Sequence, residues 1–143
     1  MQYRDIFKTG DKISALGYGT MGLGGAFGSF DKKEAIRSIH ASLENGVNFF
    51  DTARHYGNAE EILGQALIQW KGKKPFIATK IQSHGKDNTR WAIPSKPEET
   101  FPQHCIIEDT HKSLKRLGVD CIDHQKMSIA CHQKKNCSCQ KMI

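Results

Sequence analysis

Residues 46–57 give the first indication of the fold, and they read Gly46-Val47-Asn48-Phe49-Phe50-Asp51-Thr52-Ala53-Arg54-His55-Tyr56-Gly57. The apolar beginning of this run predicts a buried strand, which leads directly into an acid, Asp51. A phenol, Tyr56, follows five residues later in a loop that a glycine closes. Because α/β proteins keep their reactive side chains at the carboxyl ends of strands, the run predicts a functional site as well as a strand.

On both sides of this run, segments with strand character alternate with segments of helical periodicity. Strands are predicted at 13–20, 47–51 and 76–80, and the start of a fourth at 119–123. This β-α-β-α-β-α-β order, with helices of about three turns, favours a parallel sheet with right-handed crossovers. The sequence therefore predicts an α/β fold.

The predicted helices carry recognisable end signals. Asp31 and Asn58 are each followed by a glutamate three residues later, as in a capping box. Gly46 stands where a glycine commonly follows the end of a helix. Ile107, His111, Leu114 and Leu117 mark a third helix, which is predicted to end at Gly118.

The positive charge is uneven along the 143 residues. The formal net charge is +6, and four lysines without any acid lie after residue 123. We therefore divide the chain into a globular part, 1–123, and a basic, cysteine-containing tail, 124–143, which is predicted to be disordered. Because the tail has no arginines and no interleaved aromatic residues, we expect no specific nucleic-acid binding.

Membrane insertion and secretion are not expected. No apolar run approaches the roughly 20 residues that span a bilayer, and the N-terminal residues lack the apolar core of a secretory signal. The odd number of cysteines, five, also speaks against a secreted disulfide framework. We expect a cytoplasmic protein.

Three side chains at successive strand ends make chemical sense together: Asp51, Tyr56 and Lys80. A phenol is by itself a weak acid near neutrality, but a neighbouring ammonium stabilises its phenolate form. A carboxylate beside the ammonium would hold it charged and oriented. Taken alone, each residue also has a structural interpretation. Lys80 can be a solvated loop lysine, Tyr56 a turn residue, and Asp51 a helix-capping acid. Only the three in order predict a proton donor for a carbonyl oxygen.

The glycines at 17, 19 and 22 match the G-x-G-x-x-G spacing of a dinucleotide-binding loop after a predicted strand. Such a loop should open directly into a helix whose N-terminus holds a phosphate. Here the next helix is predicted only near Asp31. The sequence therefore does not favour a Rossmann fold.

Five sequence blocks in the right order resemble the aldo-keto reductase family. They are Gly17-Tyr18-Gly19-Thr20-Met21-Gly22, Asn45-Gly46-Val47-Asn48-Phe49-Phe50-Asp51-Thr52-Ala53, Tyr56-Gly57-Asn58-Ala59-Glu60-Glu61-Ile62-Leu63-Gly64, Ala78-Thr79-Lys80 and Ser113-Leu114-Lys115-Arg116-Leu117-Gly118-Val119-Asp120. The resemblance covers nearly all of residues 7–123. It implies a (β/α)₈ TIM barrel that binds NADP(H) and reduces small aldehydes or ketones to alcohols.

The resemblance also implies roles for individual residues. The family's catalytic group is an Asp, a Tyr, a Lys and a His, and the first three correspond to Asp51, Tyr56 and Lys80. The segment Gly19, Thr20 and Met21, together with Asp51, matches the part of the family that lies near the cofactor's nicotinamide. No residue of the chain is assigned as a metal ligand.

The sequence departs from the family pattern after Asp123. The position of the family histidine holds Ser128 or a neighbour, and His124 comes about four residues too early. The match therefore predicts an incomplete barrel of about the first three and a half βα units, with impaired or absent turnover by this chain alone. Open sheet edges would favour self-association, and inward residues such as Phe49 and Ile77 would lack a cover.

An alternative interpretation is a non-catalytic half barrel that serves interaction or metal binding. The candidate zinc ligands are His124, Cys131, His132, Cys137 and Cys139. Their spacing is irregular and contains no C-x₂-C pair, so the pattern is a poor match to known zinc sites.

Overall fold

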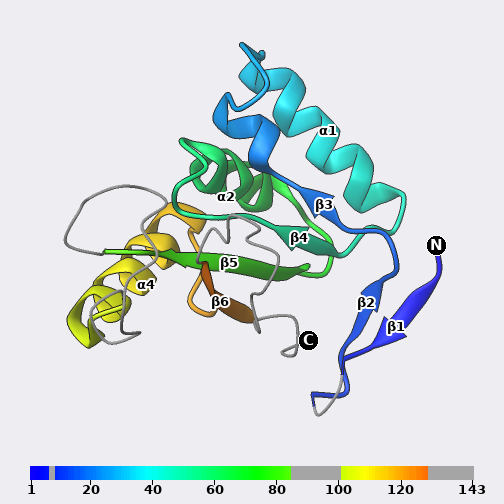
Figure 1. The fold of residues 1–143 in the computed structure, drawn as a ribbon. Coiled ribbons are helices and arrows are strands. Elements are labelled where there is room, and N and C mark those ends of the chain that lie inside the picture. The colour runs from blue at the N-terminus through cyan, green and yellow to red at the C-terminus, as the bar shows by residue number, and fades with distance from the viewer. Residues whose placement is uncertain (7–8, 85–100, 129–143) are drawn as a thin grey trace, which may run out of the picture.

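The computed structural model describes residues 1–6, 9–84 and 101–128, and its ribbon is shown in Figure 1. In chain order the elements are β1 (Tyr3–Asp5), β2 (Lys12–Ser14), β3 (Tyr18–Gly19), the 3₁₀ turn η1 (Met21–Gly24), α1 (Lys32–Glu44), β4 (Phe49–Asp51), α2 (Ala59–Gln69), β5 (Phe76–Gln82), α4 (Gln103–Leu117) and β6 (His124–Ser128). In these described residues, no helix is long and apolar enough to cross a membrane.

The central sheet has four parallel strands in the order β3-β4-β5-β6. The sheet neighbours follow the chain order, with helices between them, as the alternating pattern predicts. This is the arrangement of the first strands of a β/α barrel, with β3 and β6 at the two edges of the sheet that the described residues form. The α/β prediction and the incomplete barrel are thus confirmed.

The predicted strand over 13–20 is two strands, and this expectation was wrong. β2 pairs with β1 in an antiparallel hairpin, whereas β3 joins the parallel sheet. The chain turns between them, where the Ser14 hydroxyl donates to the carbonyl of Leu16 at 2.7 Å. The Asn48 side chain fixes the hairpin below β4, accepting from the Ser14 amide at 2.6 Å and donating to the Lys12 carbonyl at 2.8 Å.

The hydrophobic core lies between one face of the sheet and the helices. Its buried members come from α1, α2, α4 and the central strands: Ala35, Ile39, Leu43, Val47, Phe50, Ile62, Leu63, Ala66, Ile77 and Leu117. Ile77 is fully buried there, so its predicted exposure on the open face was wrong. Phe49 does point to the other face, where its ring lies 5.9 Å from that of Phe76.

The helix ends follow the sequence signals in part. The Asp31 carboxylate accepts from the amides of Lys33 and Glu34, which confirms the predicted N-cap. Asn58 precedes α2 but its side chain makes no capping hydrogen bond, so that expectation was wrong. Gly46 and Gly118 both adopt positive φ after a helix, which glycine tolerates at little cost.

The predicted third helix is present as α4, but the face that it buries is not purely apolar. Its buried residues are Asp109, Ser113 and Leu117, whereas Ile107 is half exposed and His111 is exposed. The apolar residues do repeat at helical spacing, but a carboxylate and a hydroxyl occupy the contact surface. The sequence period alone could not distinguish these faces.

The fourth strand begins later than predicted. Residues 119–123 form no strand, and β6 covers His124–Ser128, the first residues assigned to the disordered tail. The Asp123 carboxylate accepts from the Ile77 amide at 2.9 Å and lies 3.5 Å from the Lys74 ammonium. Because Asp123 binds the start of β5 with its side chain, the strand pairing begins one residue further on. Residues 129–143 lie outside the described residues.

Candidate active site

Asp51 and Lys80 form a close pair at the carboxyl ends of β4 and β5. The Lys80 ammonium donates to both carboxylate oxygens of Asp51, at 2.7 and 2.6 Å, and to the carbonyl of Thr52 at 3.0 Å. The strand register explains the meeting, since Asp51 lies level with Ala78 and Lys80 is two residues further on the same face. The Lys80 side chain is 15% exposed and that of Asp51 42%, so the pair opens toward one side.

Tyr56 completes the group on the loop between β4 and α2. The Lys80 ammonium lies 5.0 Å from the centre of the Tyr56 ring, within the range of a cation–π contact. Within the described residues the Tyr56 hydroxyl takes no hydrogen-bond partner, and the ring is half buried. The three predicted residues therefore meet, with the ammonium bridging the carboxylate and the aromatic ring.

The glycine-rich segment forms the 3₁₀ turn η1, which packs against this loop and does not lead directly into an α-helix. A Cβ on Gly24 would lie 1.9 Å from the Tyr56 carbonyl oxygen, and one on Gly57 would lie 2.7 Å from the Gly24 carbonyl oxygen. Only hydrogen can occupy the Cβ position at such distances. The first α-helix after these glycines begins at Lys32, so the rejection of a Rossmann loop is confirmed.

The other three predicted cofactor-binding residues, Gly19, Thr20 and Met21, differ in their exposure and in their contacts with Asp51. Gly19 is level with Asp51 in the sheet, and a Cβ there would meet nothing within 4 Å. Thr20 is fully buried, and both its amide, at 2.9 Å, and its hydroxyl, at 3.2 Å, donate to the Asp51 carbonyl. Met21 is 45% exposed. Gly19 thus lies level with Asp51 on the neighbouring strand, and Thr20 binds the Asp51 main chain.

A second charged cluster lies beside the Tyr56 loop, and the sequence analysis missed it. Asp109 on α4 is 1% exposed; it accepts a hydrogen bond from the Arg54 guanidinium and lies 2.8 Å from His84 Nε2. Burial, together with the Arg54 guanidinium, lowers the pKa of His84 below its ordinary value. These residues are far apart in the sequence and belong to no recognised motif.

A buried carboxylate at the start of α2 was also missed. Glu60 is fully buried, and it accepts from the Thr79 hydroxyl at 2.7 Å. The Arg116 guanidinium lies 3.8 Å from its second oxygen. Thr79 is the neighbour of Lys80 on β5, so Glu60 ties the strand to the helix that follows Tyr56. A signal was present, since Glu60 stands within the motif that begins at Tyr56.

The β5–β6 register places the residues discussed for the fourth catalytic position. Lys126 is level with Lys80, Ser128 with Gln82, and His124 with Ala78. His124 thus lies two register positions before the Lys80 level, toward the amino ends of the strands. Four of the candidate zinc ligands lie outside the described residues: Cys131, His132, Cys137 and Cys139. Within the part of the chain that the structure describes, no group of His, Cys, Asp and Glu side chains is suited to hold a metal ion.

Residues 15–134 match the aldo/keto reductase family. The chain belongs to this family. It is 35% identical over 127 residues to the aldo-keto reductase YhdN of Bacillus subtilis, covering 86% of this chain and 36% of that protein. It is 38% identical over 128 residues, with the same coverage, to an Arabidopsis thaliana protein named a "probable voltage-gated potassium channel subunit beta".

Among solved structures, the fold is similar to that of a glycerol dehydrogenase from Gluconobacter oxydans. The TM-score is 0.68 at 29% identity, over 87% of this chain and 38% of that one. The chain thus spans about a third of the length of the curated relatives that it matches. The family membership agrees with the open, four-stranded part of a barrel described above.

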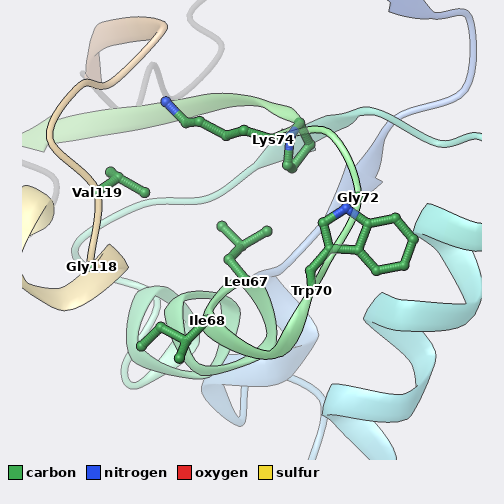
Figure 2. Close-up of a pocket in the computed structure, with 8 residues that line it drawn as sticks. Leu67, Ile68, Trp70, Gly72, Lys74, Gly118 and Val119 are labelled. Carbon is green, nitrogen blue, oxygen red and sulfur yellow. The ribbon is translucent and has the colours of Figure 1, made fainter.

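A pocket of about 190 Å³ lies at the opposite end of the strands, between the end of α2 and the turn after α4 (Figure 2). It is lined by Leu67, Ile68, Trp70, Gly72, Lys74, Pro75, Gly118 and Val119. The Lys74 ammonium is engaged with the Cys121 carbonyl at 2.9 Å. The pocket contains none of the three candidate catalytic residues, and it adds nothing to the site.

Proposed function

We propose that this chain carries the proton-donating part of an NADP(H)-dependent reductase of small aldehydes and ketones. The observation that supports the proposal most directly is the Lys80 ammonium, which contacts the Asp51 carboxylate and lies over the Tyr56 ring. A cation placed there compensates the charge that a phenol acquires when it gives up its proton. The family membership supports the same reaction class.

In the proposed reaction the Tyr56 hydroxyl donates its proton to the carbonyl oxygen of the substrate. Lys80 stabilises the phenolate that remains, and Asp51 keeps the ammonium in place through its two oxygens. Bound NADPH supplies the hydride that adds to the carbonyl carbon. No residue of the chain is proposed for the role of the family histidine, and we expect turnover to be weaker than a complete catalytic group would allow.

The residues present fit the nicotinamide end of the cofactor. Gly19 leaves open space beside the partly exposed Asp51, and Met21, two residues further along the chain, is exposed. A flat ring could lie against this glycine without meeting a side chain. We propose Gly19, Thr20, Met21 and Asp51 as the residues around the nicotinamide, with Thr20 acting through its hydrogen bonds to Asp51.

The direct test uses NADPH with a broad substrate such as 4-nitrobenzaldehyde and follows the loss of reduced-nicotinamide absorbance. We expect Tyr56→Phe to abolish any turnover. Tyr3→Phe is the matched control, because it removes the same hydroxyl from an exposed residue whose partner is the Gly46 carbonyl. Turnover that survives Tyr56→Phe undiminished would refute the assignment of the proton donor.

We also propose that the chain associates with itself through the open edges of its sheet. β3 and β6 are edge strands, and such strands present unpaired backbone groups to other chains. Sedimentation measurements over a range of concentrations test this, and we expect species larger than the monomer. A cooperative thermal transition of a strict monomer at low concentration would contradict it. The cytoplasmic location stays a prediction.

A further inference from the structure

The cluster around Asp109 connects the two chain segments that carry the candidate catalytic residues. Arg54 lies two residues before Tyr56, and His84 lies four residues after Lys80. The two oxygens of one carboxylate serve these two segments, Oδ1 binding Arg54 and Oδ2 facing His84 Nε2 at 2.8 Å. A single side chain of α4 thus binds both segments, one through each of its carboxylate oxygens.

A second residue of α4 reinforces the connection. Arg116, seven residues after Asp109 and so on the same face of the helix, donates to the Arg54 carbonyl at 3.3 Å. Arg54 is therefore held at its guanidinium and at its main chain, by two residues from one helix. Its side chain is 18% exposed and that of Asp109 2%, so little solvent competes with these contacts.

The chemistry of the cluster suggests more than a contribution to fold stability. Burying a carboxylate with a guanidinium requires the removal of water from both groups, and well-packed apolar residues often stabilise a fold as well or better. What an ion pair provides beyond them is direction, because a guanidinium binds a carboxylate in a defined geometry. Here the direction is imposed on the loop that presents Tyr56.

We propose that Asp109 is a positioning residue, which holds the Tyr56 loop and the end of β5 in register through Arg54 and His84. The expected effect of Asp109 on catalysis rests on the proposed function. Its effect on the position of the Tyr56 loop does not. Within the described residues, the side-chain hydrogen bonds and ion pairs of Asp109 go to Arg54 and His84, and not to Tyr56 or Lys80. Loss of its charge should therefore move Tyr56 relative to Lys80 while the core of the sheet stays intact.

The test is ¹⁹F NMR on the full chain labelled with 3-fluorotyrosine. The sequence has three tyrosines, and the resonance of Tyr56 is assigned by its loss in Tyr56→Phe. We expect Asp109→Asn to shift or broaden the Tyr56 resonance and to leave those of Tyr3 and Tyr18 unchanged. The matched control is Asp120→Asn, the same substitution at an exposed residue just after the end of α4.

Equal spectra for folded Asp109→Asn and Asp120→Asn would overturn the proposal. If Asp109→Asn loses its cooperative unfolding transition, Arg54→Gln decides in the same way: a selective shift of Tyr56 supports the proposal and an unchanged resonance overturns it. Where the chain turns over, kcat should fall by roughly tenfold to a hundredfold with KM little changed. An inactive wild-type chain would count against the proposed function alone, since the resonance reports the position of Tyr56 without turnover.

Discussion

Replacing Gly24 with alanine tests how the glycine-rich turn supports the candidate site. The new Cβ would lie 1.9 Å from the carbonyl oxygen of Tyr56 and 2.5 Å from its carbon. To reach an ordinary contact of 3.4 Å, the oxygen must move by about 1.5 Å. Both partners of the clash are backbone atoms, so no side-chain rotation can relieve it.

The cost has two parts. Overpacking a close contact typically destabilises a fold by about 1–3 kcal/mol. The Tyr56 carbonyl also accepts from the Ala59 amide at 3.0 Å, at the first residue of α2, and its loss costs about 0.5–1.5 kcal/mol. Together we expect a decrease of about 2–4 kcal/mol in the free energy of unfolding. For a domain of this size that corresponds to a fall in Tm of about 10 °C.

The assay is chemical denaturation followed by circular dichroism, with Gly22→Ala as the matched control. Gly22 lies in the same 3₁₀ turn, and its new Cβ would meet only the Phe27 side chain at 3.4 Å. Both variants gain the same restriction of the unfolded chain, so their difference isolates the clash with Tyr56. If Gly24→Ala unfolds at the same denaturant concentration as Gly22→Ala, the close packing of the turn on the Tyr56 loop is wrong.

Three further changes test the fold and the charged cluster. Asp31→Ala removes the N-cap of α1 and should lower the free energy of unfolding by about 1 kcal/mol, as measured by thermal unfolding. Asp120→Ala, at an exposed residue, should leave this free energy nearly unchanged. Ile39→Ala, at a fully buried position, should lower the free energy of unfolding by about 2–5 kcal/mol, as measured by denaturant titration. Its control, Ile68→Ala, changes a residue that is 70% exposed and should lower that free energy by less than about 0.5 kcal/mol. The pKa of His84 is lowered from 6.5 by burial, so the unfolded chain binds more protons below pH 6.5, and stability should fall as the pH drops from there toward the folded-state pKa. His84→Gln should remove that component from the pH profile of unfolding, and an unchanged profile would contradict the assignment.

Much of the fold could be predicted because its signals are local. The Asp31 cap, the glycine after α1 and the apolar start of β4 each depend on neighbours within a few residues, and all appear in the structure. The errors concern features set by distant contacts. The break between β2 and β3 depends on Asn48, some 34 residues away, and the late start of β6 depends on Asp123 binding the amide of Ile77.

The candidate site divides in the same way. Asp51, Tyr56 and Lys80 could be predicted because each ends or follows a recognisable strand within a known motif. Asp109 could not, since an acid in the middle of an amphipathic helix normally indicates the solvated face. Its burial arises only when Arg54 and His84 arrive from two other segments, and no period in the sequence encodes that meeting.

The sheet topology explains why Asp51 and Lys80 can pair within only part of a barrel. β4 and β5 are adjacent, and α2 joins them, so Asp51, Tyr56 and Lys80 need only one strand–helix–strand unit to meet. Glu60 and Thr79 link the same helix and strand from the buried side. The position that corresponds to the family histidine, Ser128 or a neighbour, falls instead at the end of β6, an edge strand of the described sheet. The three residues that we propose to hold and tune the proton donor therefore all lie within residues 49–82, in one strand–helix–strand unit.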